Sequence, residues 1–199
     1  VDFGNAINVT GLGTHGWWSI DPGTQGSNVW LIRGYGWKNR STLKEYANET
    51  ELKKRNPTRS IKNIAGVTCG GTGHAIYKGH LYCNRANTNK VVKIDINTET
   101  IVQERVIQDA GSQDEYTYDW GGLSNIDFAL DDNDVMYVIY GCFSRAGIMA
   151  VSKLDMDSLS ILQTWYTSIS KNKVGNAFIV KGVLYVLNSH SKPTYISYF

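Results

Sequence analysis

The sequence lacks several features that would place it in common functional classes. No apolar run approaches the roughly 18 residues that a membrane-spanning helix needs, so membrane insertion is not expected. The formal net charge is only +2, which is too small to indicate nucleic acid as a partner. No signal peptide opens the chain, so a secreted origin would require a mature form or an excerpt of a longer protein.

Cysteine is scarce, and its spacing excludes the usual metal and redox motifs. The three cysteines are Cys69, Cys83 and Cys142, and none lies at zinc-finger or CxxC spacing. At most one disulfide can form within the chain, which leaves one thiol over. The sequence leaves open whether any pair forms, and the cysteine count does not decide the cellular compartment.

Catalytic motifs are also missing. No GxSxG elbow accompanies the scattered histidines, so a Ser-His-Asp hydrolase has little support. The segment GGTGH (70–74) lacks the spacing of a phosphate-binding loop and a following helix, so a close backbone approach explains its glycines better. A glycosidase carboxylate pair cannot be assigned from sequence because the separation of the pair is spatial. We therefore assign no catalytic residues and do not expect an enzyme.

What the chain does have is a composition that supports a folded β domain. Hydrophobic residues make up 42% and charged residues 19% of the 199 positions, so a core can form over residues 1–199 as one domain. Short runs rich in Val, Ile, Tyr and Phe alternate with turns rich in Gly, Asn and Asp, and no long segment has helical period. The pattern predicts an all-β fold.

Internal repeats sharpen this prediction. YKGHLYC (77–83) matches VKGVLYV (180–186). Two sets of equivalent residues recur at steps of about 50 residues: Tyr82, Tyr137 and Tyr185, and Lys44, Lys93 and Lys153. Four short strands per repeat are typical of a β-propeller, and a β-sandwich with fortuitous hairpin similarity is the alternative. At this period the chain supplies about four blades.

A polar residue recurs where the innermost strand of a blade would begin. Strand alternation in SNIDFAL places Asn125 and Asp127 on one face, and the next repeat offers Asn176 while an earlier one offers His74. Oxygen ligands from Asp127 and Asn176 suit a hard cation such as Ca²⁺, although that ion takes 6–8 oxygens. The alternative is that Asp127 only accepts hydrogen bonds from backbone amides or His74.

Two surface patterns bear on partners and location. The triplets that begin at Asn8, Asn39 and Asn48 match the N-glycosylation pattern, which favours a secreted glycoprotein. A basic cluster flanks Asn56-Pro57, and we interpret it as a solvated loop rather than a polyanion site. The cluster consists of Lys53, Lys54, Arg55, Arg59 and Lys62.

Four ordered blocks resemble the olfactomedin domain. They are GTGHAIYKGHLYCNRANTNKVVKIDINTETIVQE, YDWGGLSNIDFALDDND, VSKLDMDSLSILQTWYTSI and GNAFIVKGVLYVLNS. The resemblance is strong from residues 71 to 189 and weaker at the front, where GWWSIDP and TLKEYANETEL still match in outline. It implies a five-bladed propeller, of which about four blades would be present here. It also implies a secreted or cell-surface protein that binds other extracellular proteins in adhesion, signalling or matrix, without catalysis.

The resemblance also implies a metal site. Many members hold Ca²⁺ in the central channel, and their pattern makes Asp127 and Asn176 side-chain ligands and Ala177 a carbonyl ligand. In some members a neighbouring Na⁺ binds the carbonyl at the position of Phe128. A further Asp of the family lies in a final blade beyond residue 199. A family disulfide is not expected, because its positions read Phe3 and Lys181 here.

One alternative function remains, in which the propeller acts on glycans instead of binding proteins. A glycan-binding or glycan-processing propeller would present a carboxylate pair in an open pocket, whereas a binding module would bury its polar site on the axis. The sequence does not decide the partner, the flanking domains or the oligomeric state.

Overall fold

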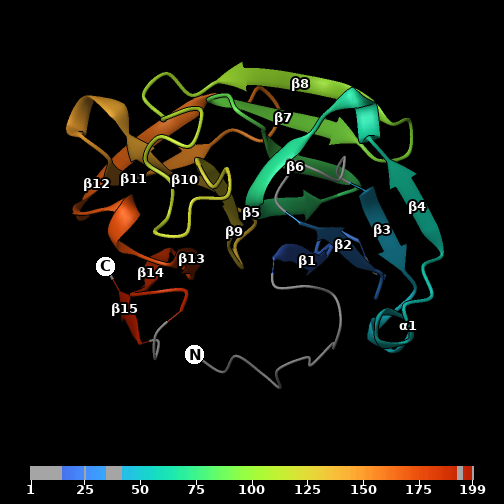
Figure 1. Ribbon diagram of the computed structural model, residues 1–199. Coiled ribbons are helices and arrows are strands. Elements are labelled where there is room, and N and C mark those ends of the chain that lie inside the picture. The colour runs from blue at the N-terminus through green and yellow to red at the C-terminus, as the bar shows by residue number, and fades with distance from the viewer. Residues whose placement is uncertain (1–14, 25, 35–41, 192–194, 199) are drawn as a thin grey trace.

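The computed structural model describes residues 15–24, 26–34, 42–191 and 195–198. Within these ranges the chain forms four antiparallel sheets, each built from strands that follow one another in sequence (Figure 1). The first sheet contains β1 (Gly16–Ile20), β2 (Val29–Arg33), β3 (Thr42–Tyr46) and β4 (Arg59–Lys62). The second contains β5 (Cys69–Tyr77), β6 (His80–Arg85), β7 (Lys90–Asp95) and β8 (Thr100–Val106).

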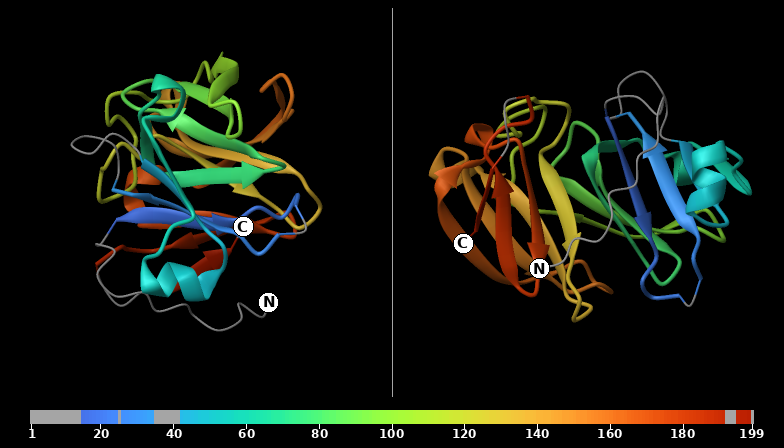
Figure 2. Two further views of the ribbon diagram at one scale, coloured as in Figure 1. Left: turned by 90° about the vertical axis from the view of Figure 1, so that its right-hand side faces the viewer. Right: turned by 90° about the horizontal axis from the view of Figure 1, so that it is seen from below.

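The third and fourth sheets continue the same order. The third contains β9 (Ile126–Leu130), β10 (Met136–Cys142), β11 (Ile148–Leu154) and β12 (Ile161–Ser170). The fourth contains β13 (Asn176–Val180), β14 (Val183–Leu187) and β15 (Ile196–Tyr198). The strands β1, β5, β9 and β13 are innermost, and the sheets stand side by side as the blades of a propeller (Figure 2). The predicted all-β propeller with about four blades is confirmed.

Both predicted repeat registers are confirmed by the strand order. Tyr82, Tyr137 and Tyr185 lie on β6, β10 and β14, the second strands of three successive sheets. Lys44, Lys93 and Lys153 lie on β3, β7 and β11, the third strands of three successive sheets. The hairpins at Lys78-Gly79 and Lys181-Gly182 both have two residues with positive φ, which matches the twist of antiparallel strands.

Apolar side chains fill the spaces between neighbouring sheets. Ile32, Leu43 and Leu81 belong to the core between the first and second sheets, and Tyr82 and Phe128 to the core between the second and third. Since a sheet inside the ring is covered on both faces, β6 and β7 are buried along four consecutive residues. The outer strands β8 and β12 are mostly exposed.

The helical segments are short, which is why no helical period stood out in the sequence. The only α-helix among the described residues is α1 (Glu49–Lys54), whose N-cap Asn48 accepts a hydrogen bond from the Glu51 N–H. Three 3₁₀ turns are also present: η1 (Ile64–Gly66), η2 (Phe143–Arg145) and η3 (Lys171–Lys173). No helix of the described ranges is long and apolar enough to cross a membrane.

The basic cluster lies only partly in a loop. Lys53 and Lys54 end α1, where positive charge complements the helix dipole, and Arg59 and Lys62 belong to β4. The loop prediction is correct for the segment around Asn56-Pro57 and wrong for these flanks. Regular structure forms there because the Asn48 cap and pairing of β4 with β3 supply the backbone hydrogen bonds.

One disulfide joins two strands of the second sheet. Cys69 of β5 and Cys83 of β6 are bonded, with their Cα atoms 5.6 Å apart, and both are buried. Cys142 is the thiol left over and is buried on β10. Its Sγ lies 2.7 Å from Asp109 Oδ2, and burial together with this carboxylate raises the pKa of the thiol. The Cys142 thiol is therefore poorly reactive.

Asp21 joins the first two sheets through backbone contacts. It is 4% exposed and follows β1 in the turn that SIDPGT forms. Its Oδ1 accepts hydrogen bonds from Gly23 N (2.9 Å) and Lys78 N (2.8 Å), and its Oδ2 accepts one from Gly79 N (2.7 Å). The carboxylate thus accepts hydrogen bonds from two backbone N–H groups of the β5–β6 hairpin in the neighbouring sheet.

We expect Asp21→Ala to lower the free energy of unfolding by about 3 kcal/mol, because three backbone N–H groups lose a charged acceptor. Asp21→Asn keeps one oxygen acceptor and should lower the free energy of unfolding by less than Asp21→Ala does. Chemical denaturation of both variants measures the difference. Equal stability of Asp21→Ala and the wild type would show that the contact contributes nothing.

Candidate metal centre

Asp127 lies on the innermost strand of the third sheet and is almost fully buried. It is the second residue of β9 and is 3% exposed. Its carboxylate packs against Gly73 of β5, where an added Cβ would lie 2.1 Å from Asp127 Cγ. Position 73 must therefore remain glycine, and the close-approach interpretation of GGTGH is confirmed.

A buried lysine lies near the Asp127 carboxylate, and its positive charge favours the ionised form of Asp127. Lys171 begins η3 and is fully buried. Its Nζ donates to the carbonyl oxygens of Asn125 (3.1 Å) and Ser124, and it lies 4.1 Å from the centre of the Tyr118 ring. Sequence reasoning missed both Lys171 and Tyr118, since neither lies in a strand pattern and Lys173 nearby is an ordinary exposed lysine.

Burial shifts the pKa values of Asp127, Lys171 and Tyr118, and the charges of Asp127 and Lys171 modify these shifts. Burial raises the pKa of Asp127, while the nearby Lys171 and Tyr118 oppose the rise. Burial lowers the pKa of Lys171 to about 8, and Asp127 opposes that change. The pKa of Tyr118 is held well above its usual value by burial first and then by the Asp127 carboxylate.

Two buried oxygen atoms in this region, Asp127 Oδ1 and Asn125 Oδ1, have no hydrogen-bond partner in the described ranges. The other end of the Asn125 amide is engaged, because its Nδ2 donates to the Glu115 carbonyl at 2.7 Å. Buried polar atoms without partners are costly, so an unpaired carboxylate oxygen here fits a bound hard cation.

Asn176 and Ala177 open the innermost strand of the fourth sheet. The Asn176 side chain is exposed, and its Oδ1 accepts a hydrogen bond from the Ala177 N–H at 2.8 Å. Asn176 lines an open cavity of about 580 Å³ together with Gly16 of β1 and Thr72 of β5. Residues from three innermost strands therefore meet where the sequence predicted the channel.

The structure brings Asp127 close to the start of β13. Strands β9 and β13 contact each other. Besides burial, the Asp127 carboxylate raises the pKa of Tyr118 and the Ala177 backbone lowers it. The Phe128 side chain lies on the opposite face of β9, in the core between the second and third sheets, so only its carbonyl is available as a ligand. Calcium binding by these residues stays a prediction.

Histidine does not join this carboxylate. His74 is 4% exposed, and its ring packs edge-on against Trp17 of β1 with centroids 5.7 Å apart. Neither ring nitrogen has a hydrogen-bond partner in the structured ranges. The described residues contain no group of three or more His, Cys, Asp or Glu side chains that could hold a metal ion. A metal ion at Asp127 would therefore rely on one carboxylate together with amide and carbonyl oxygens.

The pKa of His74 predicts an acid-sensitive stability. Burial lowers it from 6.5 to about 4, so between these pH values the unfolded chain binds a proton that the folded chain does not. We expect stability to fall by up to about 3 kcal/mol as pH drops through this window, and to be unaffected by His74 above it. His74→Phe keeps the contact with Trp17 and removes the titration. Between pH 6.5 and about 4, the free energy of unfolding should fall less in this variant than in the wild type. An equal fall in both proteins would contradict the assignment.

Of the three predicted glycosylation sites, only Asn48 lies within the described residues. Asn48 is exposed as the N-cap of α1, and its Oδ1 accepts the hydrogen bond that caps the helix. Asn8 and Asn39 lie outside the described residues.

The four sheets, with a buried polar cluster near their innermost strands, define the chain as a β-propeller. Among solved structures, Raptor from Chaetomium thermophilum superposes with a TM-score of 0.54 at 10% identity, over 92% of this chain and 15% of that protein. That likeness shows the fold alone.

The family model named "Olfactomedin-like domain" matches residues 5–199, so the chain belongs to the olfactomedin-like domain family. It is 34% identical to myocilin of Bos taurus over 185 residues and 33% identical to myocilin of Rattus norvegicus over 184 residues. These alignments cover 91% and 90% of this chain but only 37% and 36% of the relatives. The predicted family is confirmed, and the chain spans little more than a third of these relatives.

Proposed function

We propose that this domain is an extracellular protein-interaction module whose central channel holds a structural Ca²⁺ ion. Membership of the olfactomedin-like family supports the interaction role. The unpaired, buried Oδ1 of Asp127 is the observation that carries the calcium proposal. The exposed Asn48 in a glycosylation triplet supports secretion.

The proposed ion would join two blades. Asp127 supplies a carboxylate from β9, while Asn176 supplies an amide oxygen and Ala177 a carbonyl oxygen from β13, with water able to complete the shell. The Asn176 oxygen must exchange its hydrogen bond to the Ala177 N–H for the ion. A Na⁺ ion beside the calcium would use the Phe128 carbonyl. Because the ion binds only the folded state, it stabilises the fold by mass action.

A glycan-binding propeller is the second candidate, and one polar cavity favours it. This cavity of about 390 Å³ is lined by groups that suit sugar hydroxyls, among them Asp119, Asn188 and Lys173. The Tyr195 ring at its rim is 65% exposed and offers a stacking surface.

One binding experiment separates the two functions. Labelled, folded domain is added to intact cells, and saturable binding is measured before and after surface treatment with protease or with glycosidases. The interaction module predicts that protease abolishes binding while glycosidases leave it intact. Loss of binding after glycosidase treatment, with unglycosylated surface proteins still present, would favour the glycan reader instead.

A further inference from the structure

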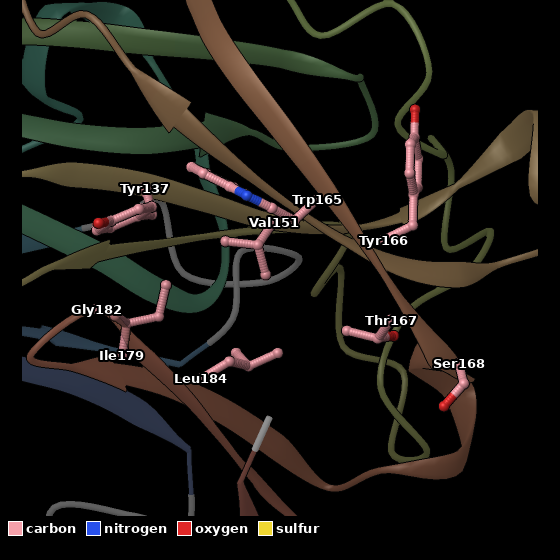
Figure 3. Close-up of a pocket in the computed structure, with 9 residues that line it drawn as sticks. All are labelled: Tyr137, Val151, Trp165, Tyr166, Thr167, Ser168, Ile179, Gly182 and Leu184. Atoms are coloured by element: carbon pink, nitrogen blue, oxygen red, sulfur yellow. The ribbon is translucent and has the colours of Figure 1, made fainter.

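A third cavity lies between the third and fourth sheets, and Asp127 is not among its lining residues. Its volume is about 450 Å³, which is within the range of small-molecule sites. Figure 3 shows Tyr137, Val151 and Trp165 along one side and Ile179 and Leu184 along the other. The remaining lining residues are Tyr166, Thr167, Ser168 and Gly182.

The base of this cavity is apolar and its wall is aromatic. Val151, Ile179 and Leu184 are each at most 7% exposed, so they form a dry floor. Trp165 is 43% exposed, and its ring lies 6.4 Å from the Tyr137 ring at a tilt of 51°. An open aromatic face above an apolar floor suits a flat ring system.

The opening persists because no side chain fills it. Gly182 occupies the β13–β14 hairpin with φ +71°, and a Cβ added there would contact nothing within 4 Å. Tyr166 points away from the floor in Figure 3, and the Arg145 guanidinium stacks 3.9 Å from the centre of its ring. These two features leave the space between Trp165 and Leu184 accessible.

The polar groups of the lining limit the chemistry of an occupant. None of the nine lining residues is charged, so a charged ligand would lose its hydration without a compensating partner. The Thr167 hydroxyl already donates to the Met149 carbonyl (3.0 Å) and accepts from the Ile169 N–H (3.2 Å). The Tyr137 hydroxyl interacts with Asp131. The indole N–H of Trp165 and the Ser168 hydroxyl make no hydrogen bond within the ranges the structure describes.

We propose that this cavity binds a flat, uncharged, largely aromatic small molecule that carries a carbonyl or ether oxygen. The ring system packs on the floor of Val151 and Leu184 with its edge toward the Trp165 indole, so that its oxygen lies in the indole plane. There the oxygen accepts a hydrogen bond from the indole N–H of Trp165. The lining of this cavity shares no residue with the proposed calcium ligands.

Nile red, which is flat, uncharged and carries a carbonyl group, is a direct probe. Its emission is titrated against the folded full-length protein, and coumarin and coumarin-3-carboxylate serve as neutral and anionic competitors. We expect saturable one-to-one binding, displacement by coumarin, and at least about tenfold weaker displacement by the carboxylate.

Three variants locate the binding. Trp165→Ala removes the aromatic wall and Val151→Phe fills the floor, and each should weaken binding about tenfold. Trp18→Ala is the matched control, because Trp18 of β1 is 46% exposed but lies in another sheet. Circular dichroism checks the fold of each variant, and Val151→Phe keeps the test decisive if Trp165→Ala does not fold.

Several results would overturn the proposal. They are the absence of saturable binding, equal competition by the carboxylate, and equal losses in Trp18→Ala and Trp165→Ala. Because the domain contains six tryptophans, the contribution of Trp165 is the difference in acrylamide quenching between the full-length wild type and Trp165→Ala. No difference would show that other parts of the protein cover the cavity, and would also overturn the proposal.

Discussion

Replacing Asp127 by Ala should abolish calcium binding and lower the free energy of unfolding by about 3–5 kcal/mol. The binding is lost because Asp127 is the only carboxylate among the proposed ligands. The stability is lost because Lys171 then remains buried without its compensating charge. Isothermal calorimetry with calcium, and thermal melts in calcium and in excess chelator, measure the two effects separately.

The controls for this prediction differ in charge and position. Asp127→Asn keeps the side-chain volume and one acceptor oxygen but removes the charge, so it should also lose the calcium-dependent shift in Tm. Asp132→Asn changes an exposed carboxylate of the same segment and should leave calcium binding unchanged. An unchanged calcium affinity in folded Asp127→Ala would exclude Asp127 as a ligand.

Replacing Lys171 by Met should lower the free energy of unfolding by about 3–5 kcal/mol when calcium is absent. The change leaves the carbonyl oxygens of Ser124 and Asn125 without their donor and Asp127 without a nearby positive charge. Calcium should restore part of this stability, because the ion would supply the positive charge that Lys171 supplied. The calcium-induced rise in Tm should therefore be larger in Lys171→Met than in the wild type.

Two comparisons make the Lys171 prediction specific. Lys173→Met alters an exposed lysine two residues away and should change neither stability nor the response to calcium by a measurable amount. In the double variant Lys171→Met/Asp127→Asn, the loss should be smaller than the sum of the single losses, since both partners of one interaction are removed. A smaller calcium response in Lys171→Met than in the wild type would contradict the shared role of lysine and ion.

The repeating strands were predictable because their signals are local. Strand alternation and the Lys-Gly hairpins recur along the chain, so Tyr82, Tyr137 and Tyr185 could be aligned without a structure. The short helix α1 escaped prediction because six residues are too few to show a helical period, although the Asn48 cap was a usable signal.

The candidate site was predictable only in part. Asp127 and Asn176 stood out as polar residues in apolar strands. Tyr118 and Lys171 lie outside the strands, and nothing in their local sequence distinguishes a buried lysine from an exposed one. His74 was grouped with Asp127 from its repeat position, whereas its ring packs against Trp17 of the first sheet.

The sequence by itself determined the strands, their order and the burial of Asp127, because alternation and turn residues act over a few neighbouring positions. Only the tertiary structure decided which groups compensate that burial. The Lys171 ammonium reaches carbonyls 46 and 47 residues earlier in the chain, and Asp21 reaches a hairpin 57 and 58 residues later. Partners at such separations meet only when the sheets stack, since the packing of whole blades sets their distance.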